Sequence, residues 1–117
     1  MSRAVIVAST LLVIPVLLSG CATVPQLTNQ GSKVRQISAD EAKQCKFLQT
    51  VQYTDTVQGV GKSPGLVRQA GDIGLRNAIG AVGGNAFVSV QADADWFFGH
   101  VNYSGESYRC PEQEAPR

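Results

Sequence analysis

An apolar run at the N-terminus limits how much of this 117-residue chain can belong to a folded domain. The run covers residues 4–18 and follows a single basic residue, Arg3. It is shorter than the roughly 20 apolar residues that a membrane-spanning helix needs. A basic start, an apolar run of this length and small residues behind it are typical of a secretory signal peptide. We therefore expect residues 1–20 to be removed, which leaves 97 residues for the mature chain.

The residues that end the run indicate the kind of leader. Leu18, Ser19, Gly20 and Cys21 match a bacterial lipobox, in which small residues permit signal-peptidase cleavage and the cysteine thiol accepts a diacylglycerol. The sequence predicts a mature chain that begins at a lipidated Cys21 and is held in a membrane by acyl chains of the palmitate type. Two or more such chains make the attachment stable. An uncleaved anchor helix, or an ordinary signal peptide with a chance cysteine, is the alternative.

The residue after Cys21 predicts which membrane receives the protein. Ala22 occupies the position at which an aspartate favours inner-membrane retention in enteric bacteria. We therefore expect an outer-membrane lipoprotein that faces the periplasm.

The remaining cysteines, Cys45 and Cys110, form an even pair in a chain predicted to be exported. An oxidising compartment favours a disulfide between them. The bridge would close a loop of about 65 residues and stabilise the fold by about 4 kcal/mol in the chain-entropy model. Two reduced thiols, or half of a metal site, are the alternatives. Zinc held by this pair and His100 would lack a fourth ligand, so we expect no metal and no cofactor.

Size and charge narrow the function classes. A mature chain of this length is one small domain. Apart from Arg3 in the leader it has nine basic and nine acidic residues, so it is close to neutral. No basic patch stands out, and we expect no binding to nucleic acid.

Composition divides the chain into four parts. After the signal peptide, residues 21–32 comprise the lipidated cysteine and a small, polar segment with Pro25, Asn29 and Gly31, which predicts a flexible tether. Fully extended, this tether would reach about 36–40 Å. Residues 33–110 form the predicted domain, and residues 111–117 form a polar, flexible tail.

Hydrophobic periodicity predicts the elements of the domain. Alternating or β-branched and aromatic residues predict strands at 33–37, 47–53, 86–91 and 100–110, the last one bent or interrupted near Ser104 and Gly105. Ser38 and Glu41 fit a capping box, so a short helix is expected over 39–44. A polar loop is expected over 54–65 and a turn over 93–99.

The main helix is expected over 66–82. Leu75, Ala78, Ile79 and Val82 recur at helical spacing and form one apolar stripe. Glycines at positions 71, 74 and 80 weaken the helix and suggest that it packs closely on a sheet. Gly83 is suited to end the helix in a left-handed cap.

The element order predicts the fold class. A long helix between two strands suggests a crossover between parallel strands, and the last two strands should pair antiparallel. We expect an α+β fold with a small mixed β-sheet, one long helix packed on one face, and one disulfide.

Three strings in the chain resemble the YjeI-like lipoproteins, small bacterial envelope proteins of unknown function. The lipobox and the segment from Val34 to Leu48 form the first string, residues 75–77 and 83–86 form the second, and residues 106–110 form the third. The group looks distantly similar to RcsF, an outer-membrane lipoprotein that senses envelope stress. The resemblance implies an RcsF-like α+β fold and a disulfide between Cys45 and Cys110. It implies no catalytic residues, and RcsF has a second bridge that this chain lacks.

Three consecutive aromatics, Trp96, Phe97 and Phe98, are the candidate binding residues of the domain. In a turn they cannot all point into one core. Either two pack on the edge of the sheet, or the cluster is exposed and contacts a partner or a membrane surface.

No residue set in the sequence suggests catalysis. His100 is the one histidine, and no nucleophile and acid accompany it at a spacing that suggests a hydrolase. The sequence therefore predicts a non-enzymatic interaction domain with an envelope protein as its possible partner. An RcsF-like stress sensor and an uncharacterised enzyme are the alternatives.

Overall fold

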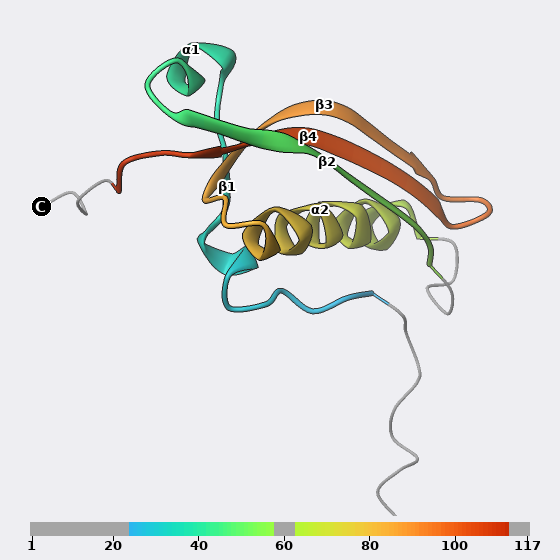
Figure 1. Cartoon of the computed structure of the whole chain (residues 1–117). Helices are drawn as coiled ribbons and strands as arrows, with labels where there is room; N and C mark the ends of the chain where they lie inside the picture. Colours follow the sequence, from blue (N-terminus) through green and yellow to red (C-terminus); the bar gives the residue numbers. More distant parts are fainter. Residues whose placement is uncertain (1–23, 58–62, 113–117) are drawn as a thin grey trace, which may run out of the picture.

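The domain is a four-stranded mixed sheet with one long helix across one face (Figure 1). The computed structural model describes residues 24–57 and 63–112. The predicted signal peptide, the lipobox with Cys21, and most of the predicted tail lie outside the described residues. The elements are η2 (Gly31–Lys33), β1 (Arg35–Gln36), α1 (Ala39–Ala42), β2 (Lys46–Thr56), α2 (Pro64–Ala81), β3 (Ala86–Asp95) and β4 (His100–Arg109).

The sheet has the strand order β1-β3-β4-β2. Strand β4 pairs antiparallel with both β2 and β3, so β2 and β3 run in the same direction with β4 between them. Helix α2 connects these two strands, as the crossover prediction required. Strand β1 adds a short parallel pair at the edge of β3. The predicted α+β class, the mixed sheet and the antiparallel final pair are confirmed.

Two glycines allow α2 to lie directly on the sheet. A Cβ atom at Gly71 would overlap the ring of Tyr103 in β4, and one at Gly74 would overlap the ring of Tyr53 in β2. The two tyrosines are opposite each other in the β2–β4 ladder. The helix therefore packs its backbone against two aromatic rings, and the predicted close packing is confirmed.

The apolar side chains of α2 fill the space beside these rings. Val67, Leu75 and Ile79 are fully buried and belong to one core cluster with Phe87 and other residues of the sheet. Arg76 lies at the border of this core, where it pairs with Asp72 at 2.9 Å and its guanidinium lies over the Phe87 ring. Val82, the last residue of the predicted stripe, is exposed because the helix ends at Ala81. Gly83 follows with a φ of 89°, as predicted for a left-handed cap.

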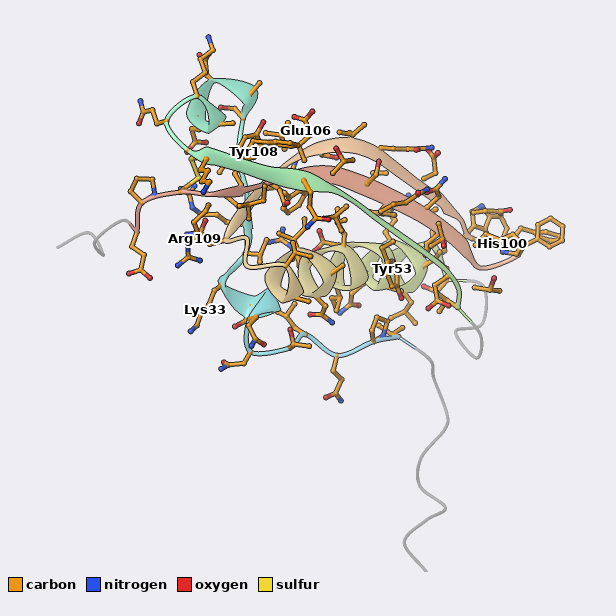
Figure 2. The ribbon with its side chains drawn as sticks, in the orientation of Figure 1. Lys33, Tyr53, His100, Glu106, Tyr108 and Arg109 are labelled. Carbon is orange, nitrogen blue, oxygen red and sulfur yellow. A yellow bond between two sulfur atoms is a disulfide. The ribbon has the colours of Figure 1, made fainter. Side chains whose placement is uncertain are left out.

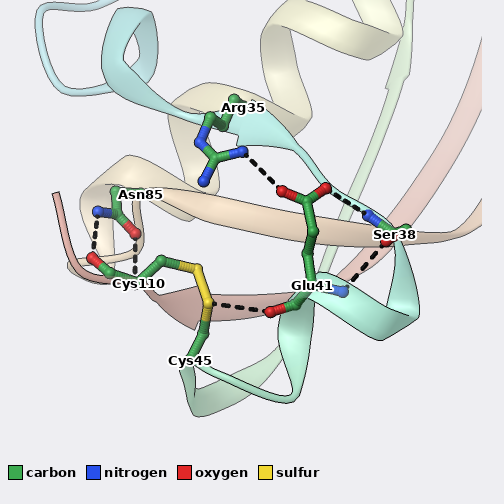
Figure 3. Close-up of a disulfide and its surroundings, with 6 residues drawn as sticks. All are labelled: Arg35, Ser38, Glu41, Cys45, Asn85 and Cys110. Carbon is green, nitrogen blue, oxygen red and sulfur yellow. Dashed lines mark hydrogen bonds and ion pairs between the residues drawn. A yellow bond between two sulfur atoms is a disulfide. The ribbon is translucent and has the colours of Figure 1, made fainter. Parts of the chain in front are cut away.

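A disulfide closes the end of the domain opposite the β3–β4 turn (Figure 3). Cys45 follows α1, and Cys110 follows β4, so the bridge ties the start of β2 to the end of the sheet. Asn85 accepts from the Cys110 amide at 2.8 Å and donates to its carbonyl at 2.9 Å. The predicted disulfide is therefore confirmed, and the Asn85 side chain fixes the backbone beside it.

The capping box of α1 orders the approach to this bridge. The Ser38 hydroxyl accepts from the Glu41 amide, and the Glu41 carboxylate accepts from the Ser38 amide. Glu41 also pairs with Arg35 of β1 at 3.3 Å. The predicted cap is confirmed, although α1 ends at Ala42 and β1 spans just two residues.

The structure differs from the predicted tether over residues 21–32. The Asn77 side chain accepts from the Thr28 amide at 2.8 Å and donates to the Gln26 carbonyl at 2.8 Å. A Cβ at Gly80 would lie 2.8 Å from the Gln30 carbonyl carbon, so this glycine packs against the incoming chain and not against the sheet. From Gln26 onward the segment is docked on α2 and belongs to the folded unit, which begins earlier than the predicted boundary at residue 33.

Strands β2 and β3 are longer than periodicity predicted. β2 continues to Thr56 and β3 continues to Asp95, so the turn shortens to residues 96–99. β4 passes through Ser104 and Gly105 without a break. A Cβ at Gly105 would lie 3.0 Å from the Phe87 ring, so this glycine makes room for a core aromatic. The irregularity at this point is in β3, where the register with β4 shifts between Ser89 and Gln91.

We expect Gly71→Ala to lower the free energy of unfolding of the mature protein by about 1–3 kcal/mol, because the added methyl overlaps the Tyr103 ring. Gly65→Ala is the matched control, since a Cβ there meets nothing within 4 Å. Alanine's better helix propensity should leave the control unchanged or slightly more stable. Urea unfolding measures both variants, and equal stability of the two would contradict the proposed helix–sheet contact.

Candidate functional site

The β3–β4 turn places three aromatic side chains in solvent. Trp96 is 48%, Phe97 51% and Phe98 62% exposed. About half or more of each side chain is exposed, which favours the exposed alternative over packing of two rings on the edge of the sheet. We call Trp96, Phe97 and Phe98 the aromatic tip.

The rings of the aromatic tip pack against one another. Trp96 and Phe97 meet edge to face with centroids 5.8 Å apart, and Phe97 and Phe98 do the same at 4.8 Å. Phe98 stacks on the His100 ring at 5.9 Å. The four rings form a continuous chain whose outer surfaces face water, so the tip presents one connected apolar surface.

The backbone of the turn is fixed by hydrogen bonds to the strand ends. The Gly99 amide donates to the Asp95 carbonyl at 2.7 Å, and the Val57 amide donates to the Gly99 carbonyl at 2.7 Å. Gly99 has a φ of 79°, and a Cβ there would overlap the Val57 carbonyl oxygen. The Asp95 carboxylate also accepts from the amides of Phe97 and Phe98. These hydrogen bonds join the backbone of the turn to the end of β2.

His100 lies at this same end of the sheet (Figure 2). Its Nδ1 is 3.1 Å from the Thr56 hydroxyl, its neighbour across the β2–β4 ladder. Asp95 is its neighbour in β3, but that carboxylate is occupied by the turn amides. A hydrolytic histidine needs an acid that orients it and a nucleophile that it activates. Near His100 the structure offers the Thr56 hydroxyl on an open surface and the Asp95 carboxylate, which is hydrogen bonded to backbone amides of the turn.

The sheet face that α2 does not cover carries a second apolar cluster at the α1 end, which includes Ile37, Ala86 and Tyr108. Farther along β2 the same face is polar. Thr50, Gln52 and Thr54 of β2 are exposed there, and Gln52 donates to Asn102 of β4 at 2.9 Å. Other large apolar residues are exposed on the domain, such as Val90 at 60%, but they are not consecutive. Isolated exposed apolar residues are normal on soluble domains, whereas a contiguous cluster marks an interaction site.

A groove of about 410 Å³ lies at the opposite end of the domain. Lys33, Arg35 and Arg109 line it together with the end of α2. Arg35 already pairs with Glu41, and Asn85 in its wall is satisfied by Cys110. The groove is cationic at its rim, but no unpaired polar side chain that the structure describes is buried in it.

Three tyrosines of the sheet are held in their neutral form. Burial, then a hydrogen bond to Asp55 and the charge of that carboxylate, raise the pKa of Tyr53 to about 12. Burial and the charge of Asp72 raise the pKa of Tyr103, and burial and a hydrogen bond to Glu106 raise that of Tyr108. All three remain protonated at neutral pH, so none of them supplies a base or a nucleophile.

Within residues 24–57 and 63–112, no group of His, Cys, Asp or Glu side chains could hold a metal ion. In the same part of the chain, no helix has the length and apolar character needed to cross a membrane. Cys21 and its lipobox neighbours lie outside the described residues, so lipidation stays a prediction.

The chain matches no protein-family model, no curated protein and no solved structure. The resemblance to the YjeI-like lipoproteins stays a prediction that rests on the sequence strings alone. What the structure adds to the predicted site is the set of hydrogen bonds that Asp95 and Gly99 make in the turn. The spacing of an acid before a short turn that ends in glycine is the sequence signal for them.

We expect Asp95→Ala to loosen the aromatic tip without unfolding the sheet. The variant loses the acceptor for the amides of Phe97 and Phe98, an effect comparable to the loss of a helix cap, about 0.5–2 kcal/mol. Amide hydrogen exchange at these two residues should become faster. Asp93→Ala is the control, because Asp93 accepts from the Gln91 side chain and not from the turn. Unchanged exchange in Asp95→Ala would show that the turn does not need this carboxylate.

Proposed function

We propose that this protein is a lipid-anchored, non-enzymatic binding domain on the periplasmic face of the bacterial outer membrane. Its contact surface in this proposal is the aromatic tip. The observation that carries the proposal is the exposure of three consecutive aromatics on a turn that is fixed by Asp95 and Gly99. Exposure of a contiguous aromatic cluster to water is energetically unfavourable, and on soluble domains such a cluster marks an interaction site. Aromatic residues are enriched where proteins bind partners.

The same observations argue against an enzyme. The single histidine stacks on Phe98 at the surface, and its hydrogen bond goes to Thr56. Catalytic sites place an activated group in a cleft that excludes water. The hollow beside His100, lined by residues 54–56 and Val101, is broadly open to water. The more enclosed groove, lined by Lys33, Arg35, Arg109 and Glu112 among others, lies at the other end of the sheet, away from the histidine.

The disulfide has a structural role in this proposal. Cys110 is buried and Cys45 is half-buried, and the bridge joins the end of α1 to the end of β4 beside the Asn85 contact. A redox switch of a stress sensor needs an accessible, easily reduced bridge. We therefore propose a binding domain as the first candidate function and an RcsF-like sensor as the second.

The anchor is tested by the intact mass of the protein purified from bacterial envelopes. We expect a chain that starts at Cys21 and carries the added mass of a diacylglycerol, with or without an amide-linked acyl chain. Cys21→Ser is the control and should keep its leader and lack the lipid. A full-length chain without lipid in the wild type would contradict the proposal.

The contact surface is tested with a photoactivatable side chain at position 98 in living cells. Val90 is the matched control site, because it is apolar and as exposed as Phe98 but lies on β3 away from the turn. We expect crosslinked adducts, to lipid or to one defined protein, at position 98 and not at position 90. Equal yields at the two sites would show that the tip is not a contact surface.

A further inference from the structure

We propose that the aromatic tip inserts into the interfacial layer of the same membrane leaflet that holds the lipid of Cys21. The occupant of the tip is then a lipid surface, and the domain lies on the membrane in one orientation. The proposal rests on the proposed lipidation of Cys21. It is argued from the length of chain before Val24 and from where that chain leaves the fold.

The docked segment shortens the leash. Cys21 is three residues before Val24, and three extended residues reach at most about 11 Å. Val24 packs on the core, and Gln26 and Thr28 are hydrogen bonded to Asn77. The domain therefore has about a quarter of the reach that a free tether over 21–32 would give it. An anchor this short keeps the domain surface within contact distance of the lipid headgroups.

The chain leaves the fold toward the end that bears the tip. Gln30 contacts Gly80 near the C-terminus of α2, and Thr28 contacts Asn77 one turn earlier, so the segment runs toward the N-terminus of the helix as it approaches Val24. That end of α2 follows β2, whose last residues meet the β3–β4 turn through the Val57–Gly99 hydrogen bond. Figure 1 shows the segment in blue passing beneath α2 toward the side of the turn.

The chemistry of the tip fits an interface between water and hydrocarbon. Tryptophan and phenylalanine are favoured at this depth of a bilayer. The chain has no Lys or Arg between Ala86 and Tyr108, whereas Asp93 and Asp95 lie just before the turn. Basic clusters are the feature that directs proteins to anionic lipids. The tip therefore binds through apolar contact, and it suits uncharged headgroups.

Attachment through Cys21 makes weak insertion sufficient. A surface held near its binding site by a short link binds at a high effective concentration. The orientation that results turns the groove lined by Lys33, Arg35 and Arg109 away from the membrane, since it lies at the other end of the sheet (Figure 2).

Trp96 is the single tryptophan of the chain and reports directly on this contact. The mature lipidated protein is reconstituted into phosphatidylcholine vesicles in which part of the lipid is brominated near the headgroup end of the acyl chains. We expect bromine to quench roughly half or more of the Trp96 emission and the spectrum to shift to the blue, because the indole lies at the interface. Bromine near the chain ends should quench less.

The double variant Trp96→Phe with Phe47→Trp is the matched control. Phe47 is exposed to the same extent as Phe97, and it lies nine residues before Thr56 in β2, about 30 Å from the end beside the tip. This tryptophan should not be quenched. A second variant, Phe97→Ser with Phe98→Ser, keeps Trp96 but should lose most of the quenching while its unfolding curve stays unchanged.

The intact mass of each sample separates this proposal from the one on which it rests. Lipidated protein with an unquenched Trp96 would overturn membrane insertion and leave the tip to a protein partner. Protein without lipid on Cys21 would overturn both proposals. Quenching that grows when phosphatidylglycerol replaces a third of the phosphatidylcholine would show charge attraction, which contradicts apolar contact with neutral headgroups.

Discussion

Helix α2 can lie close against the sheet because two of its residues are glycine. Gly71 and Gly74 let the helix backbone rest on Tyr103 and Tyr53, which face each other in the β2–β4 ladder. This contact sets the height of the helix above the sheet. It also sets the height of the surface on the far side of the helix, where Asn77 and Gly80 receive the incoming chain. The helix therefore connects two layers, the sheet on one side and the N-terminal segment on the other.

The layers could be predicted from the sequence because their signals are local. The capping box at Ser38, the stripe through Leu75 and Ile79, and the glycine that ends α2 each specify an element within a few residues. The pairing of Cys45 with Cys110 followed from the count of cysteines in an exported chain. The fold class, the number of strands and the disulfide could therefore be predicted from the sequence.

The docking of the N-terminal segment on α2 could not be predicted from the sequence, because its partner is far along the chain. Residues 24–32 have the composition of a linker, and nothing in them indicates a contact with Asn77 about fifty residues later. The last glycine of α2, Gly80, was the available clue. It was assigned to the sheet, whereas Gly80 faces the incoming backbone. The state of the aromatic tip was likewise undecided, since composition does not say whether a turn folds back on the sheet. Strands β3 and β4 extend beyond the part of the sheet that α2 covers, and this extension determines where the turn lies.

The charges near the tip determine which membrane composition favours the proposed orientation. Among the described residues at this end of the sheet, Asp55, Asp93 and Asp95 outnumber Arg68 on the first turns of α2. On an anionic leaflet the acidic end would be repelled, but this repulsion acts over about 8 Å at physiological salt. Contact of the rings with the interface acts at shorter range. It becomes more favourable in proportion to the apolar area that is removed from water. On a neutral leaflet the short-range contact has no opposing charge term, so the aromatic tip and the short anchor hold the same end of the domain on the lipid.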